Sequence, residues 1–144
     1  MKVKLMQKEL EFQTTKIIDG KNAILGRLAS YVSKKALKGE KIIILNCGDV
    51  IITGNKKNIR ETFLDKRSKV GSGQKGPKYS RLDYKIVKRA IRGMLPNHRK
   101  GRGKTAYNLI RCYNNIPEEF EKSEKIVFEN KKNKFIKIKD IYIK

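Results

Sequence analysis

Tryptophan is absent from the 144-residue chain, and so are long apolar segments. The longest purely apolar run is four residues, Ile42 to Leu45, whereas a membrane-spanning helix needs about 20. The opening residues, MKVKLMQKELEF, lack the apolar centre of a secretory signal. Basic helices that lie on membranes present a Trp, Phe or Leu face, so the missing tryptophan also argues against a membrane surface as the partner. We therefore expect no membrane association.

Metal-ligating and nucleophilic side chains are scarce too. The chain has one histidine, His98, and two cysteines, Cys47 and Cys112, with no CxxC pair. This excludes the usual zinc spacings. No Ser–His–acid or Cys–His arrangement occurs at a familiar spacing, so acid–base or nucleophilic catalysis is not indicated. The sequence predicts no metal, no cofactor and no enzymatic site, and two core thiols in a reducing cytosol.

Acidic residues are the third scarcity. The chain has 14 acidic and 36 basic residues, for a net charge of +22. Residues 56–111 hold 18 basic and 3 acidic residues, which is +15 of that total. Such a density of positive charge repels itself in a free protein. A polyanionic partner that neutralises it is the simplest explanation, and the length predicts one domain, residues 1–144.

Apolar periodicity predicts alternating strands and helices. Strands are expected at 16–18, 41–45, 50–53 and 109–113. Helices are expected at 24–36 and 56–66, and a further helix starts at Asp83 and is ended by Pro96, which pushes the preceding residue out of helical geometry. The predicted fold class is α/β, a small, mostly parallel four-stranded sheet with helices on its faces. Residues 68–81, with three glycines and one proline, are expected to be a functional loop. Residues 1–14 are a possible N-terminal extension, and 118–144 a tail without a clear place.

The stretch from Asp83 to Lys104 carries the strongest functional signal. Its helical part places two sets of residues on opposite sides, an apolar set of Ile86, Val87, Ala90, Ile91 and Met94, and a cationic set of Lys85, Lys88, Arg89 and Arg92. A basic loop with two glycines, 97–104, is expected to follow. Charged rows on helices are usually solvated surfaces threaded by salt bridges, but no acid occurs between Asp83 and Glu118. The pattern therefore favours contact with nucleic acid.

The aromatic residues of this region are few: Phe63, Tyr79, Tyr84 and Tyr107. They do not form the local signature by which proteins stack single-stranded bases. We therefore expect recognition of folded, double-helical RNA through phosphates and 2′-hydroxyls.

Two glycine motifs resemble nucleotide-binding sequences. Residues 71–76 spell GxGxxG, but the dinucleotide fingerprint needs a strand before it and a helix after it, and here Pro77 follows. Gly103-Lys104-Thr105 matches the end of a P-loop, but the first glycine of that motif falls on His98. A magnesium-binding aspartate after a buried strand is also missing. A small P-loop-like NTPase is kept only as an alternative.

Several short motifs occur together in one order: IDG at 18–20, ILGRLAS at 24–30, ILN at 44–46, ITGN at 52–55 and RGMLP at 92–96. On these motifs the chain resembles large-subunit ribosomal protein family thirteen, of the archaeal and eukaryotic type, from residue 15 to residue 120. The resemblance implies a three-layer α/β/α fold with a four-stranded parallel sheet. It also implies a structural role, binding large-subunit ribosomal RNA during assembly and holding its helices together. The loop after Pro96 is a residue or two longer than in the family, and residues 1–14 have no counterpart in it.

We therefore expect a non-enzymatic, cytoplasmic constituent of the large ribosomal subunit that acts in assembly and translation. Its expected partners are large-subunit ribosomal RNA and neighbouring ribosomal proteins, with no membrane and no small-molecule substrate. The side chains predicted to bind the RNA are Lys66, Arg67, Lys69, Lys75, Lys78, Arg81, Lys85, Lys88, Arg89, Arg92, His98, Arg99, Lys100, Arg102 and Lys104. A non-ribosomal RNA-binding regulator is the other alternative, and it would not travel with ribosomal particles.

Overall fold

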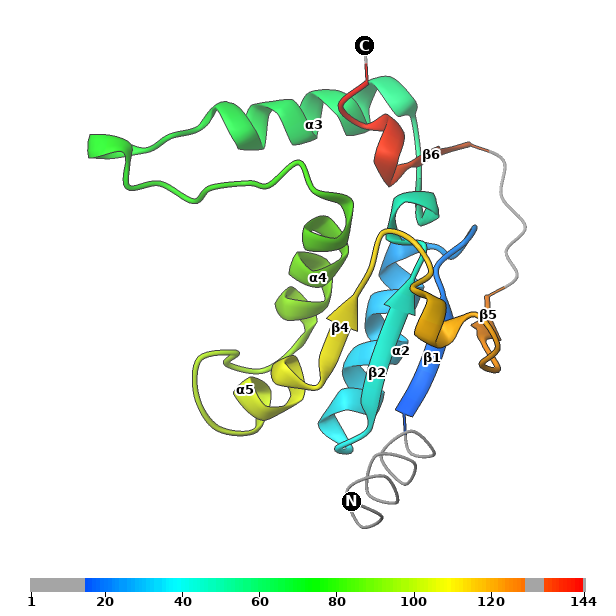
Figure 1. Ribbon diagram of the computed structural model, residues 1–144. Coiled ribbons are helices and arrows are strands. Elements are labelled where there is room, and N and C mark those ends of the chain that lie inside the picture. The colour runs from blue at the N-terminus through cyan, green and yellow to red at the C-terminus, as the bar shows by residue number, and fades with distance from the viewer. Residues whose placement is uncertain (1–14, 129–133, 144) are drawn as a thin grey trace.

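A computed structural model describes residues 15–128 and 134–143. Figure 1 shows how its strands and helices are arranged. In chain order they are β1 (Thr15–Asp19), α2 (Leu25–Leu37), β2 (Lys41–Leu45), β3 (Ile51–Thr53), α3 (Lys56–Ser68), α4 (Asp83–Met94), α5 (Gly101–Asn108), β4 (Ile110–Cys112), β5 (Ile126–Val127) and β6 (Phe135–Lys137). Short 3-10 turns occur at η1 (Cys47–Asp49), η2 (Ser72–Gln74), η3 (Glu118–Phe120) and η4 (Ile138–Asp140).

The main sheet has four parallel strands in the order β4-β2-β1-β5. Strands β1 and β2 are joined through α2, which is the predicted parallel crossover unit. Successive side chains of β1 and β2 point to opposite faces of the sheet, as in any β-strand. The side chains of Ile18, Ile42 and Ile44 pack into the larger core, and those of Ile17 and Leu45 into a smaller one.

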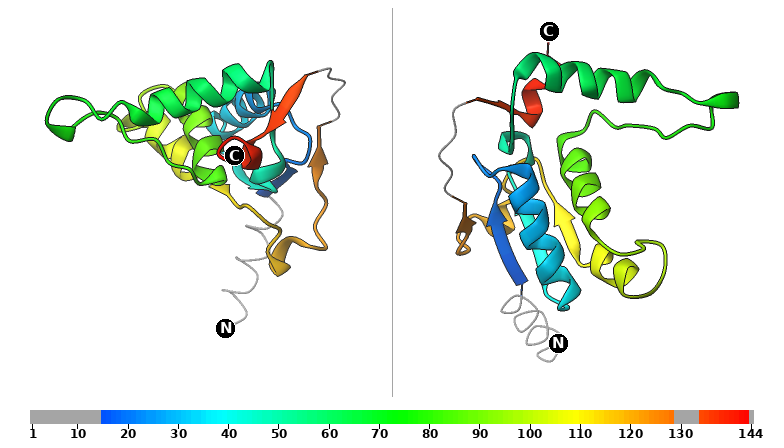
Figure 2. Two further views of the ribbon diagram at one scale, coloured as in Figure 1. Left: turned by 90° about the horizontal axis from the view of Figure 1, so that it is seen from above. Right: turned by 180° about the vertical axis from the view of Figure 1, so that it is seen from behind.

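Two layers cover this sheet. Helices α4 and α5 both contact α2, and the core between the helices and the sheet includes Leu28 and Val32 of α2. The right view of Figure 2 shows α2 (blue to cyan) on one face of the sheet, running roughly along the strands. On the other face, Phe120 of the η3 turn packs on Ile17 and Leu45. The predicted fold class, a layered α/β fold with a four-stranded parallel sheet, is confirmed.

The strand expected at 50–53 does not join the main sheet. Strand β3 pairs antiparallel with β6 in a separate two-stranded sheet. The cause lies after β2, where Asn46 adopts a left-handed conformation (φ 54°) and the η1 turn redirects the chain. The fourth parallel strand is instead β5, from the tail that the sequence did not place. A short apolar run indicates a strand but not its partner, so this assignment was beyond the sequence pattern.

The tail also completes the core. Ile136, Ile138 and Ile141 are each at most 3% exposed and belong to the larger core. The ammonium groups of Lys137 and Lys139 both lie 2.9 Å from a carboxylate oxygen of Asp49 in the η1 turn. Hydrogen bonds from Lys139 and Lys137 lower the pKa of this carboxyl. The tail is therefore tied to the η1 turn by packing and by charge.

The two cysteines are free thiols on neighbouring segments. Cys47 is buried and Cys112 half-buried, and the backbone N–H of Cys47 donates to the Tyr113 carbonyl at 3.1 Å. A hydrogen bond with Cys112, together with burial, raises the pKa of the Cys47 thiol. Within residues 15–128 and 134–143, no cluster of three His, Cys, Asp or Glu side chains could hold a metal ion. No helix in those ranges is long and apolar enough to cross a membrane.

Candidate nucleic-acid interface

Helix α4 is fixed to the body of the protein by its apolar side. Ile86, Val87 and Ile91 are buried in the core that α4 shares with α2. At its start, the Tyr84 backbone N–H donates to the side-chain oxygen of Asn114 at 3.1 Å. This satisfies one of the backbone donors that the first turn of a helix leaves free. The core residues and the cap set the orientation in which the opposite side of α4 is presented.

The end of α4 is as predicted, but one apolar residue is not. The helix ends at Met94, and Leu95 is extended before Pro96, because a proline disfavours helical geometry in the residue before it. Met94 is 47% exposed, so its predicted place on the apolar side is wrong. Leu95, 9% exposed, enters the core in its place because the chain leaves the helix there.

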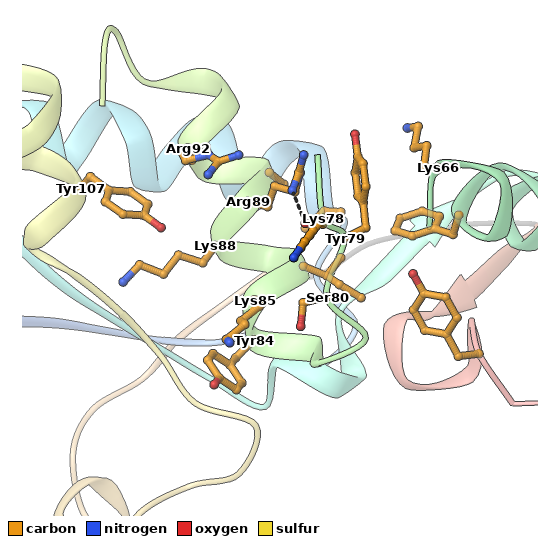
Figure 3. A pocket seen from close by; sticks show the side chains of 15 residues that line it. Lys66, Lys78, Tyr79, Ser80, Tyr84, Lys85, Lys88, Arg89, Arg92 and Tyr107 are labelled. Carbon is orange, nitrogen blue, oxygen red and sulfur yellow. Dashed lines mark hydrogen bonds between the residues drawn. The ribbon is translucent and has the colours of Figure 1, made fainter. Parts of the chain in front are cut away.

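The cationic row of α4 meets aromatic rings instead of acids. The Arg89 guanidinium lies 3.7 Å from the centroid of the Tyr79 ring and donates to the Lys78 carbonyl at 3.3 Å. The Lys88 ammonium lies 4.8 Å from the centroid of the Tyr107 ring. Figure 3 shows both pairs, with Lys85 and Arg92 extending from the same helix. A cation over a ring keeps its charge while its position is restrained, at a gain of about 0.5–1 kcal/mol for exposed pairs.

These side chains line a groove of about 770 Å³. It lies between α4, the end of α3, the segment just before α4, and Tyr107 of α5. Its cations are Lys66, Lys78, Lys85, Lys88, Arg89 and Arg92, and its aromatic side chains are Phe63, Tyr79, Tyr84, Tyr107 and Tyr142. Among the described residues, no carboxylate lines it. The groove is thus a cationic, aromatic-walled surface open to solvent.

The predicted loop 68–81 is an arm. Ser68 still belongs to α3, and residues 69–82, here called the arm, run out from the end of α3 and return to the start of α4 (Figure 1). At the tip the Gly76 N–H donates to the Val70 carbonyl at 2.8 Å. A Cβ on Gly76 would lie 2.6 Å from that carbonyl oxygen, so the close approach needs glycine. The GxGxxG sequence is therefore the tip of the arm, and no helix follows it.

The candidate residues of this part of the chain fall into two groups. Lys69 and Lys75 are exposed on the arm. Near its base, the Arg81 guanidinium lies 5.8 Å from the centroid of the Tyr142 ring, and that of Arg67 in α3 lies 5.9 Å from the same ring. Arg67 and Arg81 therefore border the groove that Lys66 and Lys78 line.

The predicted basic loop 97–104 is wrong from residue 101 on, where α5 (Gly101–Asn108) begins. The glycines at 101 and 103 lower the helix propensity of this stretch and so masked the helix. The fold needs Gly103, because a Cβ there would lie 2.5 Å from both the Pro96 and the Asn97 carbonyl oxygens. Gly103-Lys104-Thr105 is thus the interior of a helix that follows a turn instead of a strand, which is not P-loop geometry.

The remaining candidates lie at this end of the molecule. Arg99, Lys100, Arg102 and Lys104 are exposed, and the ring of His98 lies edge-on to Tyr107 at a centroid distance of 6.2 Å. No ion pair between described residues involves any of the fifteen predicted RNA-binding residues. The structure therefore brings six of them together in the groove and distributes the others over its border, the arm and the outer end around α5.

The aromatic walls of the groove are what the sequence reasoning missed. They come from α3, the arm, α4, α5 and the tail, so residues from Phe63 to Tyr142 meet only in the folded chain. No local motif could have revealed them. The one signal available was the presence of aromatic residues within a strongly basic region.

A family model described as Ribosomal protein L13 matches residues 13–119. The chain belongs to the ribosomal protein L13 family. It is similar to proteins named large ribosomal subunit protein uL13 from several archaea. The Archaeoglobus fulgidus protein is 37% identical over 87% of this chain and 83% of its own length. The Methanocaldococcus jannaschii protein is 39% identical over 87% and 93%, and the Natronomonas pharaonis protein 38% identical over 91% and 90%.

Membership of the L13 family removes one of the alternatives left by the sequence. The family is a structural component of ribosomes, so the NTPase alternative is set aside and the chain is not an enzyme. The match covers α3, the arm, α4 and α5, which provide most of the groove. Tyr142 and the strands β5 and β6 lie beyond it.

Proposed function

We propose that this chain is a structural constituent of the large subunit of the cytoplasmic ribosome and that it binds and organises large-subunit ribosomal RNA. The ribosomal role follows from membership of the L13 family, because the relatives similar to this chain are named large ribosomal subunit proteins. The observation that carries the RNA contact is the cationic row of α4, which lines a groove with two further cations and no acidic side chain among the described residues.

Phosphate oxygens are the groups that this surface is built to bind. A guanidinium can donate to two phosphate oxygens at once, whereas an ammonium acts as a point charge. Arg89 is held in place by Tyr79 and the Lys78 carbonyl before any partner arrives. Less side-chain freedom is then lost on binding, and this favours affinity.

The arm and the outer end around α5 extend the contact beyond the groove. Lys69 and Lys75 project with the arm, and Arg99, Lys100, Arg102 and Lys104 surround α5. In this proposal the arm enters between RNA helices, the α5 end contacts a further backbone, and the whole chain acts as one RNA-binding domain. Neighbouring ribosomal proteins are the other partners, and neither a cofactor nor a small-molecule substrate is required.

Sedimentation of a cell lysate tests this role. We expect the protein to travel with the large subunit on a gradient at moderate salt and to leave it at high salt, because phosphate contacts are salt-dependent. Protein that stays at the top of the gradient in growing cells would contradict the ribosomal role. If that unassociated protein still binds RNA, the contradiction points to a free RNA-binding regulator.

A further inference from the structure

The groove has one feature that a surface for phosphates alone does not need, namely its aromatic walls. Phosphate binding requires only cations and hydrogen-bond donors. Here Tyr79, Phe63, Tyr84, Tyr107 and Tyr142 line the same space as the cations. Aromatic rings beside a cationic track are the combination with which proteins hold unpaired nucleotides, since every base has a face that can stack.

Among the described residues, Tyr79 and Arg89 form the closest pair of ring and cation in the groove. The Arg89 guanidinium carbon lies 3.7 Å from the centroid of the Tyr79 ring, and the guanidinium also donates to the Lys78 carbonyl at 3.3 Å. Tyr79 is half-buried and lines the groove, so ring surface remains open to a ligand. In Figure 3 the ring stands between Arg89 and Lys78 on one side and Lys66 on the other. A base entering beside it would continue an existing stack.

Further cations line the groove beside this pair. The cations Lys85 and Lys88 lie along α4 within the same groove, where they can neutralise the phosphates that flank a base.

The groove is large enough for a small ligand, and its walls suit a base with a free face. Its volume, about 770 Å³, lies within the range of about 300–1,000 Å³ typical of sites for small ligands. The bases of an RNA duplex are stacked inside the helix and present no free face, whereas a bulged or looped-out base does. A groove with stacking walls therefore discriminates between the two.

We propose that the groove binds an unpaired nucleotide of an RNA whose flanking helices lie on the surrounding cations. The base stacks against Tyr79 beside Arg89, and its flanking phosphates meet Lys85 and Lys88. This inference rests on the proposed RNA-binding function and deepens it. It also modifies the expectation drawn from the sequence, in which only double-helical RNA was contacted. Because stacking is sequence-tolerant, the unpaired state of the base matters more than its identity.

The test compares two hairpin RNAs that differ by one unpaired adenosine in the stem. We expect the wild-type protein to bind the bulged hairpin about tenfold more tightly than the fully paired one, from the usual strength of base–aromatic stacking. With 2-aminopurine as the bulged base, its fluorescence should change on binding. Tyr79→Leu should abolish the preference, because it should weaken binding of the bulged hairpin much more than binding of the paired one, where only the restraint on Arg89 is lost. Tyr79→Phe, the matched control, should keep the preference.

Each contrary outcome has a distinct meaning. Equal binding of both hairpins by the wild-type protein, or a 2-aminopurine signal that does not change, overturns this inference and leaves the proposed function standing. Equal loss of both affinities in Tyr79→Leu also overturns it, since Tyr79 would then act only by holding Arg89. Binding of neither hairpin contradicts the proposed function itself. The wild-type fluorescence measurement does not depend on whether the variant folds.

Discussion

Two helical glycines with opposite surroundings allow a matched test of the described packing. At Gly103 in α5, a Cβ would lie 2.5 Å from the carbonyl oxygens of both Pro96 and Asn97. At Gly93 in α4, a Cβ would have no heavy atom within 4 Å other than those of its chain neighbours and of the backbone of its own helix. The same change, glycine to alanine, therefore meets backbone at one site and open space at the other.

The magnitudes follow from these surroundings. Alanine is favoured over glycine by up to about 1 kcal/mol in a helix, at both sites. At Gly103 the added methyl must push two carbonyl groups aside, and overpacking of this kind costs about 1–3 kcal/mol. With a propensity gain of about 0.5 kcal/mol at each site, we expect Gly103→Ala to lower the free energy of unfolding by about 0.5–2.5 kcal/mol and Gly93→Ala to raise it by about 0.5 kcal/mol.

Thermal and urea unfolding of the purified variants measure this difference. For a chain of this size, 1 kcal/mol corresponds to a shift in Tm of about 4 °C. Gly103→Ala should melt several degrees below wild type and Gly93→Ala slightly above it. If Gly103→Ala melts as high as Gly93→Ala, α5 does not pack against residues 96 and 97 as described. The position of Tyr107, which α5 places beside Lys88, would then be wrong as well.

Two further predictions concern the tail and the arm. Asp49→Asn should cost up to about 1 kcal/mol near neutral pH, a value kept small because the ion pairs with Lys137 and Lys139 are partly exposed. Since these lysines lower the pKa of Asp49, the wild-type advantage is present above about pH 4 and lost as the pH falls through that lowered pKa; an equal advantage in urea unfolding at pH 7 and pH 3 would contradict this. In the arm, amide exchange should be fast in the free protein and slow on ribosomal RNA, because its unbalanced charge opposes self-packing. Strong protection of arm amides without RNA would count against it.

The elements of the fold were predictable where periodicity was strong. The α2 helix, the buried β2 strand and the amphipathic α4 helix ending before Pro96 all emerged from spacing and end signals alone. What failed depended on tertiary contacts. The pairing of β3 with β6 and the entry of β5 into the sheet are set by the turn after β2, and α5 forms despite its glycines because Gly103 packs tightly.

The candidate site, too, was predictable only in part. Charge counting found the cationic row and its missing counter-charges, because charge is visible in any stretch of sequence. The convergence of the row with Lys66 and Lys78, and the aromatic walls, required segments about 80 residues apart to meet. Arg89 in particular was expected as a free phosphate ligand, whereas it is already stacked on Tyr79.

The salt dependence of RNA binding tests the central claim, that the cationic side of α4 contacts phosphate. The variant is Lys85→Gln with Arg92→Gln, which removes two charges of the row and spares Arg89, whose loss would also release Tyr79. Gln keeps good helix propensity, so α4 should persist. The matched control is Lys34→Gln with Lys38→Gln, which removes two exposed charges at the end of α2 outside the groove.

Binding to large-subunit ribosomal RNA is measured over a series of salt concentrations, and the slope of log K against log salt is compared among the three proteins. Each lost phosphate contact reduces the slope by about 0.9, so the α4 variant should lose about 1.8 and the control close to none. A slope unchanged in the α4 variant, or reduced equally in the control, would contradict the account, because the row would then be a solvated surface or only part of the general charge.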